Sequence, residues 1–209
     1  MDIIKEIYEA VMEGKVEDAA SRVQQALNSK MEANDILHKG LIAAMDVVGE
    51  KFGEGELFIP QVLWSAKAMQ AGMDLLKPLF SSTDRAEKGT VVIGTAKGDI
   101  HDIGKNLVAI MLEGSGFRVA DLGVDVTPER FIEKAMEVKA DIIAMSALLT
   151  TTMPSMGEVV RLVKERNLPI RVIIGGAPVD QTFCEEIGAD AYGMDAADGL
   201  RKVKGMLGR

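Results

Sequence analysis

The sequence predicts a mixed fold, in which an all-helical first part precedes an α/β part with a five-stranded parallel sheet. Two patterns lead to this prediction. Apolar residues recur at helical spacing up to about residue 80, whereas short β-branched runs alternate with amphipathic helical patterns beyond residue 89. Because each connection between parallel strands crosses over and covers a face of the sheet, we expect a doubly wound, Rossmann-like second part.

Four amphipathic patterns in the first part predict a small antiparallel four-helix bundle. Gly14 ends the first helix, Asn34 is a candidate N-cap of the third, and the glycines at 53 and 55 break that third helix. Pro78 follows the fourth helix. The predicted helices run from Ile3 to about Gly14, from Val16 to near Asn28–Ser29, from about Asn34 to Phe52, and from near Pro60 to Leu76.

The segment from Ser81 to Gly89 is polar and charged and ends in glycine, which is the composition of a linker between two cores. We therefore predict a domain boundary here. Residues 1–88 would form a helical-bundle domain, and residues 89–209 would form the sheet domain.

Five strand-helix units make up the predicted sheet domain. The order of the strands is open at this point, but the flavodoxin-like order 2-1-3-4-5 would place the reversal of winding between strands 1 and 3, where ligands bind in such folds. The predicted strands cover residues 90–95, 117–122, 141–147, 170–175 and 190–193. The predicted helices cover residues 104–114, 128–139, 154–166, 180–187 and 196–207.

The charge and composition of the chain limit the classes of partner that it can bind. A formal net charge of −8 without a basic stripe argues against nucleic acid or an anionic membrane as a partner. No apolar run approaches the roughly 20 residues that span a bilayer. The single cysteine, Cys184, cannot form an internal disulfide and is expected to be buried, and no secretory leader is recognisable, so we expect a cytoplasmic protein. His38, one of two histidines, is expected to be solvated.

The turn after the first predicted strand carries the most distinctive chemistry. Asp99 and His101 stand two residues apart at the mouth of this turn, so one imidazole nitrogen can face outward while the carboxylate fixes the tautomer from behind. This arrangement suits a metal ligand. The alternative is structural: His101 could cap the following helix, and Asp99 could be an ordinary turn or N-cap carboxylate.

Two further predicted strand ends carry small or hydroxyl side chains. The third strand ends near Ser146, Leu148, Thr150 and Thr152, and the fourth ends at Gly175–Gly176. With strands 1 and 3 adjacent, a cleft between their loops would hold a long ligand tail. Each feature alone also fits a polar loop or the end of an ordinary strand.

Together these pieces resemble a known signature. Asp99-x-His101-x-x-Gly104, Ser146-x-Leu148 and Gly175–Gly176, in this order, resemble the three-part motif of cobalamin-binding domains of the base-off, His-on type. The resemblance implies that His101 is the lower axial ligand of cobalt in place of the cofactor's benzimidazole. It also implies a relay in which Asp99 accepts a hydrogen bond from the far nitrogen of His101 and Thr152 completes the chain.

The resemblance implies a cobalamin or related cobamide as cofactor, whose corrin supplies four equatorial nitrogens and needs only one protein ligand. Ser146 and Leu148 would line the slot for the displaced base, and Thr150 would help to hold the nucleotide. Phe58 lies in a segment similar to the helical cap that covers the upper face of the corrin in methionine synthase. The implied cofactor-binding residues are Gly98, Asp99, Ile100, His101, Asp102, Ile103, Gly104, Ser146, Leu148, Thr150, Gly175, Gly176, Tyr192, Asp195, Ala196 and Phe58.

The order of cap and binding domain is similar to that of stand-alone corrinoid proteins of methyltransferase systems, which implies a methyl carrier. The implied partners are a substrate-specific methyltransferase, a second methyltransferase with a folate or thiol acceptor, and a reductive activase, with a hinge near residues 81–89. The alternatives are a cobalamin-binding subunit of a mutase and a B12-dependent sensor. A receiver domain fits poorly because Ser146 stands where a phosphorylatable Asp is needed, and a flavodoxin fits poorly because the first loop lacks hydroxyl side chains.

Overall fold

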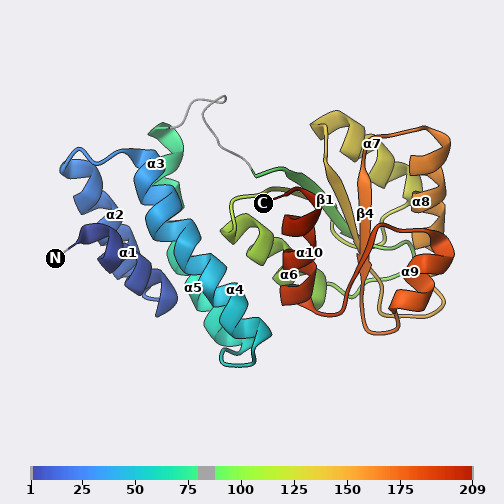
Figure 1. The fold of residues 1–209 in the computed structure, drawn as a ribbon, viewed down its shortest axis with the longest axis horizontal. Coiled ribbons are helices and arrows are strands. Elements are labelled where there is room, and N and C mark those ends of the chain that lie inside the picture. The colour runs from blue at the N-terminus through green and yellow to red at the C-terminus, as the bar shows by residue number, and fades with distance from the viewer. Residues whose placement is uncertain (1, 80–87, 209) are drawn as a thin grey trace. The chain divides into compact units, whose positions relative to one another are not determined.

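The computed structural model describes residues 2–79 and 88–208 and divides the chain into two compact units (Figure 1). Helices α1 to α5 belong to the first unit, and the five strands belong to the second. Residues 80–87, which contain most of the predicted linker, lie outside the described residues. The boundary at residue 88 therefore stays a prediction.

The helical unit is built on amphipathic helices whose apolar stripes face one another. Asp2 caps α1, because its side chain accepts a hydrogen bond from the backbone N–H of Ile4. Ile7, Val11 and Val23 are fully buried between α1, α2 and the later helices. The elements are α1 (Ile3–Met12), α2 (Val16–Asn28), α3 (Ala33–Asp35), η1 (Ile36–Ile42), α4 (Ala43–Gly53), α5 (Ile59–Leu76) and η2 (Lys77–Leu79).

The third predicted helix differs from the expectation. Residues 33–53 are helical throughout, but η1 is a π-helix, and the N-cap is Glu32 rather than Asn34. Two buried apolar pairs, at 36–37 and 41–42, are spaced five residues apart. A π-helix bonds residue i to residue i+5, so this wider turn brings both pairs to the same side, which a regular α-helix does less well.

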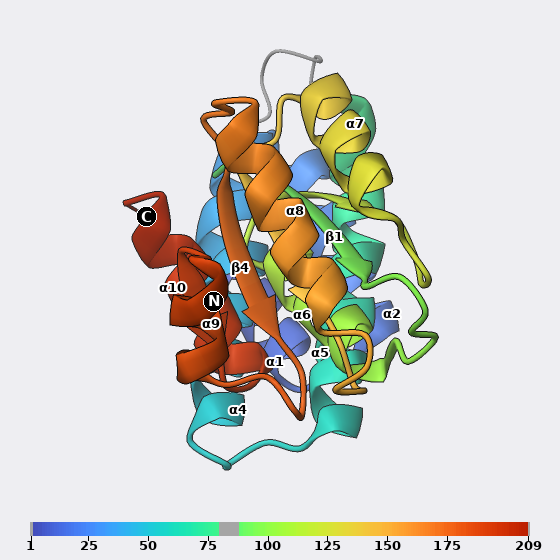
Figure 2. The same ribbon diagram turned by 90° about the vertical axis from the view of Figure 1, so that its right-hand side faces the viewer.

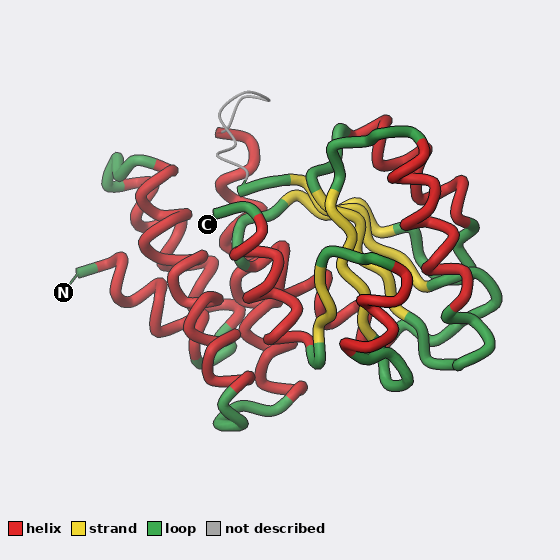
Figure 3. Tube along the Cα trace, turned by 45° about the vertical axis from the view of Figure 1, so that its right-hand side comes forward, coloured by secondary structure: helices red, strands yellow, loops and turns green. Residues whose placement is uncertain are grey.

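All five strands of the second unit are parallel, in the order β2-β1-β3-β4-β5, which confirms the flavodoxin-like order. β1 is buried along its whole length, as expected for a central strand covered on both faces (Figure 3). The strands are β1 (Thr90–Thr95), β2 (Arg118–Asp121), β3 (Ile142–Ser146), β4 (Arg171–Gly175) and β5 (Ala191–Gly193).

Helices cover both faces of the sheet, with α6 and α10 on one face and α7, α8 and α9 on the other (Figures 1 and 2). Thr127 caps α7 by accepting from the N–H of Arg130, and Pro128 occupies the first turn. Phe131, Ile132 and Met156 are fully buried in the core under α7 and α8. The helices are α6 (Ile103–Gly114), α7 (Pro128–Val138), α8 (Pro154–Glu165), α9 (Gln181–Ile187) and α10 (Ala196–Met206).

This topology brings three loops to one edge of the sheet. Thr95 pairs with Ser146 in register, and Ser146 pairs with Gly175, so the carboxyl ends of β1, β3 and β4 are level. The backbone continues this pairing beyond the strands, because Ala96 N–H donates to the Ser146 carbonyl (2.9 Å) and Ala147 N–H donates to the Gly175 carbonyl (3.1 Å). Side chains from distant parts of the sequence therefore meet here.

Among residues 2–79 and 88–208, no helix combines the length and the apolar content that crossing a bilayer requires. Cys184 is 2% exposed in α9, and burial raises the pKa of its thiol.

We predict that Cys184 reacts with iodoacetamide at pH 8 at least about a hundredfold more slowly in the folded chain than in urea, because burial limits both access and thiolate formation. Mass spectrometry of timed samples measures the rate. Labelling of the folded chain at the rate of the unfolded chain would contradict the burial.

Candidate functional site

The loop after β1 carries a tightly coupled carboxylate–imidazole pair. Oδ1 of Asp99 lies 2.7 Å from Nδ1 of His101 and also accepts the backbone N–H of His101 at 3.0 Å. The Asp99 side chain is completely buried, whereas the His101 side chain is 49% exposed. Because the carboxylate can only accept, Nδ1 carries a hydrogen, and in the neutral imidazole Nε2 then has the free lone pair. The arrangement can present one nitrogen ligand to a metal.

The loop after β3 holds the other carboxylate oxygen. Oδ2 of Asp99 accepts the N–H of Leu148 at 2.7 Å, the N–H of Leu149 at 3.3 Å and the hydroxyl of Thr152 at 2.9 Å. Thr152 Oγ1 also lies 2.8 Å from the carbonyl of Leu149, so its single hydrogen has two acceptors within reach. Asp99 thus joins the loop after β1 to the loop after β3, and Thr152, His101 and Asp99 form one hydrogen-bonded chain.

These contacts keep Asp99 ionised. Burial raises the pKa of its carboxyl, but hydrogen bonds from Leu148 N–H, from the backbone and imidazole of His101, and from the Thr152 hydroxyl outweigh burial. The net result is a pKa well below the ordinary value of a carboxyl. A fixed negative charge therefore stands behind the imidazole at neutral pH.

Exposed aliphatic side chains follow the strands at this edge. Ile100 and Ile103 are 74% and 77% exposed, and Leu148 is also exposed. Sequence reasoning missed Val124, Leu149 and Met194, which follow β2, β3 and β5 and are exposed as well. The signal that could have found them is an apolar side chain directly after a strand end, where loops are usually polar. One half-exposed imidazole at a sheet edge that also carries exposed aliphatic groups fits a macrocycle that brings its own metal.

Other predicted residues of this edge have local partners. The Asp102 carboxylate accepts from the Asn106 side chain (3.0 Å), which supports the first turn of α6. Gly104 has open space where a Cβ would stand. Gly98 has a φ of +83°, which favours glycine. Thr150 is exposed, and Ser146 is partly buried at the end of β3.

The residues predicted at the end of the fifth strand are also explained by the fold: Tyr192 lies in β5 itself, and Asp195 and Ala196 follow it. Asp195 is the N-cap of α10, since its side chain accepts the N–H of Asp198 at 2.7 Å. Lys202 donates to the carbonyl of Tyr192, and its ammonium lies 5.6 Å from the centre of the Tyr192 ring. Ala196 is buried. These contacts and the burial of Ala196 account for all three residues even if no ligand binds there. Their role in cofactor binding therefore stays a prediction.

The backbone explains the glycine pair. Gly176 has a φ of +125°, and a Cβ there would stand 1.8 Å from the carbonyl oxygen of Ala147. A Cβ on Gly175 would stand 3.0 Å from the carbonyl oxygen of Gly193. Close approach of the loop after β3 and of the last residue of β5 therefore requires small residues here. A role in passing a nucleotide tail stays a prediction.

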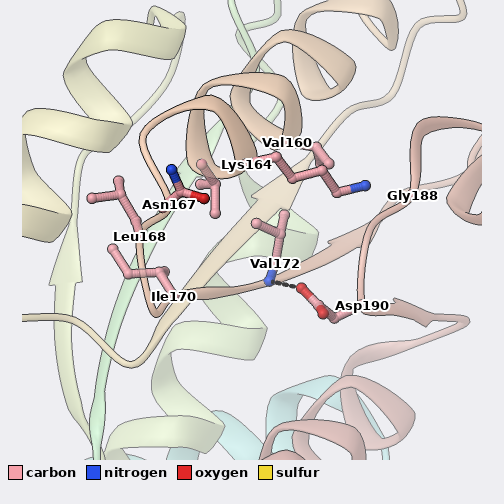
Figure 4. A pocket seen from close by; sticks show the side chains of 9 residues that line it. Val160, Lys164, Asn167, Leu168, Ile170, Val172, Gly188 and Asp190 are labelled. Atoms are coloured by element: carbon pink, nitrogen blue, oxygen red, sulfur yellow. Dashed lines mark hydrogen bonds between the residues drawn. The ribbon is translucent and has the colours of Figure 1, made fainter.

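A separate hollow lies at the opposite, amino-terminal edge of the sheet (Figure 4). Val160 and Lys164 of α8, the start of β4 and Asp190 line it. None of the predicted site residues lines this hollow. In parallel sheets ligands bind at the carboxyl ends of the strands, so the Asp99–His101 edge is the candidate site.

Comparison with known proteins identifies the family. Two family models, each described as a B12 binding domain, match residues 89–201 and residues 3–77. Trimethylamine corrinoid protein 1 of Methanosarcina acetivorans is 44% identical over 210 residues, covering 99% of this chain and 97% of the relative. A corrinoid protein of Desulfitobacterium hafniense is 40% identical over 214 residues, covering 100% and 99%. The chain belongs to the corrinoid proteins of methyltransferase systems.

A solved structure agrees with this corrinoid protein in fold. A chain in the methanol:cobalamin methyltransferase complex of Methanosarcina barkeri superposes with a TM-score of 0.91 at 34% identity, covering 99% of this chain and 80% of that one. The family membership identifies the cofactor class as cobalamin or a related corrinoid.

We predict that Gly176→Ala lowers the free energy of unfolding of the corrinoid protein by about 3 kcal/mol, because the methyl group meets a carbonyl and the φ becomes strained. Urea unfolding followed by circular dichroism measures the change. Gly205→Ala, in α10 with open space around it, is the control and should stabilise by up to about 1 kcal/mol. Equal stability of the two variants would contradict the explanation.

We predict that Asp99→Asn destabilises the cofactor-free protein by about 2–3 kcal/mol at pH 7, since an amide NH₂ would face N–H and O–H donors. The folded-state pKa of Asp99 lies below the ordinary value, so its ionised form stabilises fully above about pH 4. This contribution is lost as the pH falls toward the folded-state pKa.

Urea unfolding from pH 7 down to pH 3 tests the prediction. The difference between the natural chain and Asp99→Asn should narrow below about pH 4. A difference that stays constant with pH would show that the carboxylate charge does not contribute.

Proposed function

We propose that this corrinoid protein is a methyl carrier that binds its cobamide base-off, with Nε2 of His101 as the lower axial ligand. The observation that carries the proposal is the 2.7 Å contact between Asp99 Oδ1 and His101 Nδ1, which leaves the other ring nitrogen free on a half-exposed side chain. When bound, the corrinoid supplies a cobalt centre that accepts a methyl group from one enzyme and gives it to another.

Asp99 and Thr152 set the state of the imidazole. As hydrogen-bond acceptor, the carboxylate fixes the tautomer and makes Nε2 a better donor to the metal. When Nε2 does not ligate, it can take up a proton, and the buried anion of Asp99 stabilises the resulting imidazolium. The hydroxyl of Thr152, 2.9 Å from Oδ2, balances part of that negative charge. Proton uptake at His101 is thereby coupled to ligation.

The level ends of β3 and β4 support a slot for the displaced nucleotide. Ser146 and Gly175 are register partners at the two strand ends, and Leu148 and Thr150 are exposed on the following loop. We assign Ser146 and Leu148 to the displaced base and Thr150 to the nucleotide. Gly175–Gly176 keeps the neighbouring backbone free of side chains.

The family relatives support a division of labour with separate enzymes. Relatives are named for trimethylamine and dimethylamine, and a structural match is part of a methanol:cobalamin methyltransferase complex. We propose that a substrate-specific methyltransferase loads the carrier, that a second methyltransferase with a folate or thiol acceptor unloads it, and that a reductive activase restores it. These names favour the carrier over a mutase subunit or a sensor.

The helical unit would cover the upper face of the corrin. Phe58 is 69% exposed at the connection before α5, so its ring is available for such a contact. The hinge predicted near residues 81–89 falls mostly outside the described residues, so the opening of the cap stays a prediction.

We predict that His101→Ala, reconstituted with hydroxocobalamin, loses the imidazole ligand and binds the cofactor at least about tenfold more weakly. The visible spectrum reports ligation. In the reduced Co(II) state, electron paramagnetic resonance of protein labelled with ¹⁵N-histidine distinguishes a protein nitrogen from the cofactor's own base.

His38→Ala is the matched control, because His38 is the other histidine of the chain and belongs to the helical unit. It should keep the natural spectrum and affinity. An unchanged cobalt spectrum in His101→Ala, or a missing histidine-nitrogen coupling in the natural chain, would overturn the axial assignment.

A further inference from the structure

We propose that Asp125, in the loop after β2, is a positioning residue that holds the His101 turn in the geometry needed for ligation. This inference rests on the proposed function, in which His101 is the axial ligand. Asp125 lies outside the sequence motif that points to the cofactor, and it acts on the turn through the backbone.

Asp125 forms hydrogen bonds with the backbone of two successive residues of the turn. Its Oδ1 accepts the backbone N–H of Gly98 at 2.7 Å, and its own N–H donates to the carbonyl of Asp99 at 2.9 Å. The residues are 27 and 26 positions apart in the chain, so the contacts are tertiary and not part of a local turn. The main chain that carries Asp99 is therefore clamped from the side of β2.

This clamp complements the one on the Asp99 side chain. The loop after β3 binds the carboxylate through Leu148 N–H and Thr152, whereas Asp125 binds the peptide groups. Thr95 also fixes the turn, because its buried hydroxyl donates a hydrogen bond to the carbonyl of His101 at 2.9 Å. In Asp125→Ala the Asp99 carboxylate would keep its donors and the backbone N–H of residue 125 could still donate to the Asp99 carbonyl, but the Gly98 N–H would lose its acceptor. The imidazole would then sample a wider range of orientations.

The backbone of Asp125 is itself unusual. Its φ is +53°, in the left-handed region that non-glycine residues rarely adopt, although Asp and Asn tolerate it better than others. Glycine would remove this strain but would have no carboxylate to cap Gly98. A strained residue that makes two contacts with a ligand-bearing turn points to a functional constraint.

The loop that carries Asp125 is firmly anchored. The carbonyl of Gly123 accepts Thr95 N–H at 2.9 Å, and Val126 N–H donates to the carbonyl of Thr95 at 3.0 Å. Asp121 accepts the N–H of Gly123 and pairs with Lys105, which is only 2% exposed. A rigid support lets Asp125 transmit position to the His101 turn.

The test uses the full chain with Asp125→Ala, Asp125→Asn and a matched control, Asp190→Ala. Asp190 is also an exposed aspartate whose carboxylate caps a distant backbone N–H, that of Val172 at 2.7 Å, but it lies at the opposite edge of the sheet (Figure 4). After reconstitution with hydroxocobalamin at pH 7, the visible spectrum gives the fraction with imidazole ligation, and a titration gives the dissociation constant. Thermal unfolding is measured alongside.

Asp125→Ala should reduce the imidazole-ligated fraction and weaken binding by about tenfold. Asp125→Asn should restore both, because the amide oxygen accepts the same N–H and Asn tolerates a positive φ. Asp190→Ala should lower the thermal unfolding midpoint about as much as Asp125→Ala does, but it should leave the visible spectrum and the affinity for the cofactor unchanged. A natural spectrum in Asp125→Ala, failure of Asp125→Asn to rescue, or an equal spectral loss in Asp190→Ala would overturn the proposal.

Hydrogen exchange in the cofactor-free protein separates this inference from the axial assignment. Asp125→Ala should speed exchange of the His101 amide, which donates to Asp99 Oδ1, by about tenfold, and Asp190→Ala should not. Unchanged exchange at His101 would overturn the positioning role even if His101 ligates cobalt. If His101→Ala keeps its cobalt spectrum while Asp125→Ala speeds this exchange, the axial assignment fails and the role of Asp125 in fixing the turn stands.

Discussion

The structure of the candidate site depends on one buried negative charge. A carboxylate without exposure to water is costly unless every lone pair finds a donor. Asp99 meets this condition with five hydrogen bonds from the loops after β1 and β3. Only a sheet in which β1 and β3 are neighbours brings both sets of donors to one point. The strand order is therefore the reason that the charge can exist there.

The same charge determines what the exposed surface can do. With Nδ1 of His101 held by the carboxylate, Nε2 is the ring nitrogen that is left for a ligand. The exposed aliphatic side chains that follow the strands at this edge would disfavour an isolated aqueous metal ion but suit a macrocycle. The protein thus contributes one ligand, one orientation and an apolar surface, and leaves the remaining coordination to the cofactor.

Sequence reasoning succeeded where structure is locally encoded. Strand and helix limits followed closely from periodicity, and the family followed from a motif with locally spaced parts such as Asp99 and His101. The strand order was left open by the residues, and the flavodoxin-like order that was expected is confirmed by the structure. Sequence reasoning failed where tertiary packing determines the local structure. The π-helix η1 depends on which face residues 36–42 bury, and the contact of Asp125 with Gly98 spans 27 residues, so neither has a local signal. Asp195 is the N-cap of α10 in the structure, a role that the sequence could not separate from a ligand contact because aspartate serves both, and its ligand role stays a prediction.

The three parts of the motif differ in what explains them. Gly176 is required by the carbonyl of Ala147, so this glycine would be kept in the fold whether or not a nucleotide passes it. Asp99 ties two loops together, which is also a structural role. His101 is different: its imidazole is half exposed, and its hydrogen bond to Asp99 occupies only one ring nitrogen. Without the imidazole the backbone N–H of residue 101 would still reach the carboxylate, but Asp99 would lose one of its five donors. Nε2 takes no part in that hydrogen bond, so this second ring nitrogen is the strongest reason to interpret this edge of the sheet as a binding site.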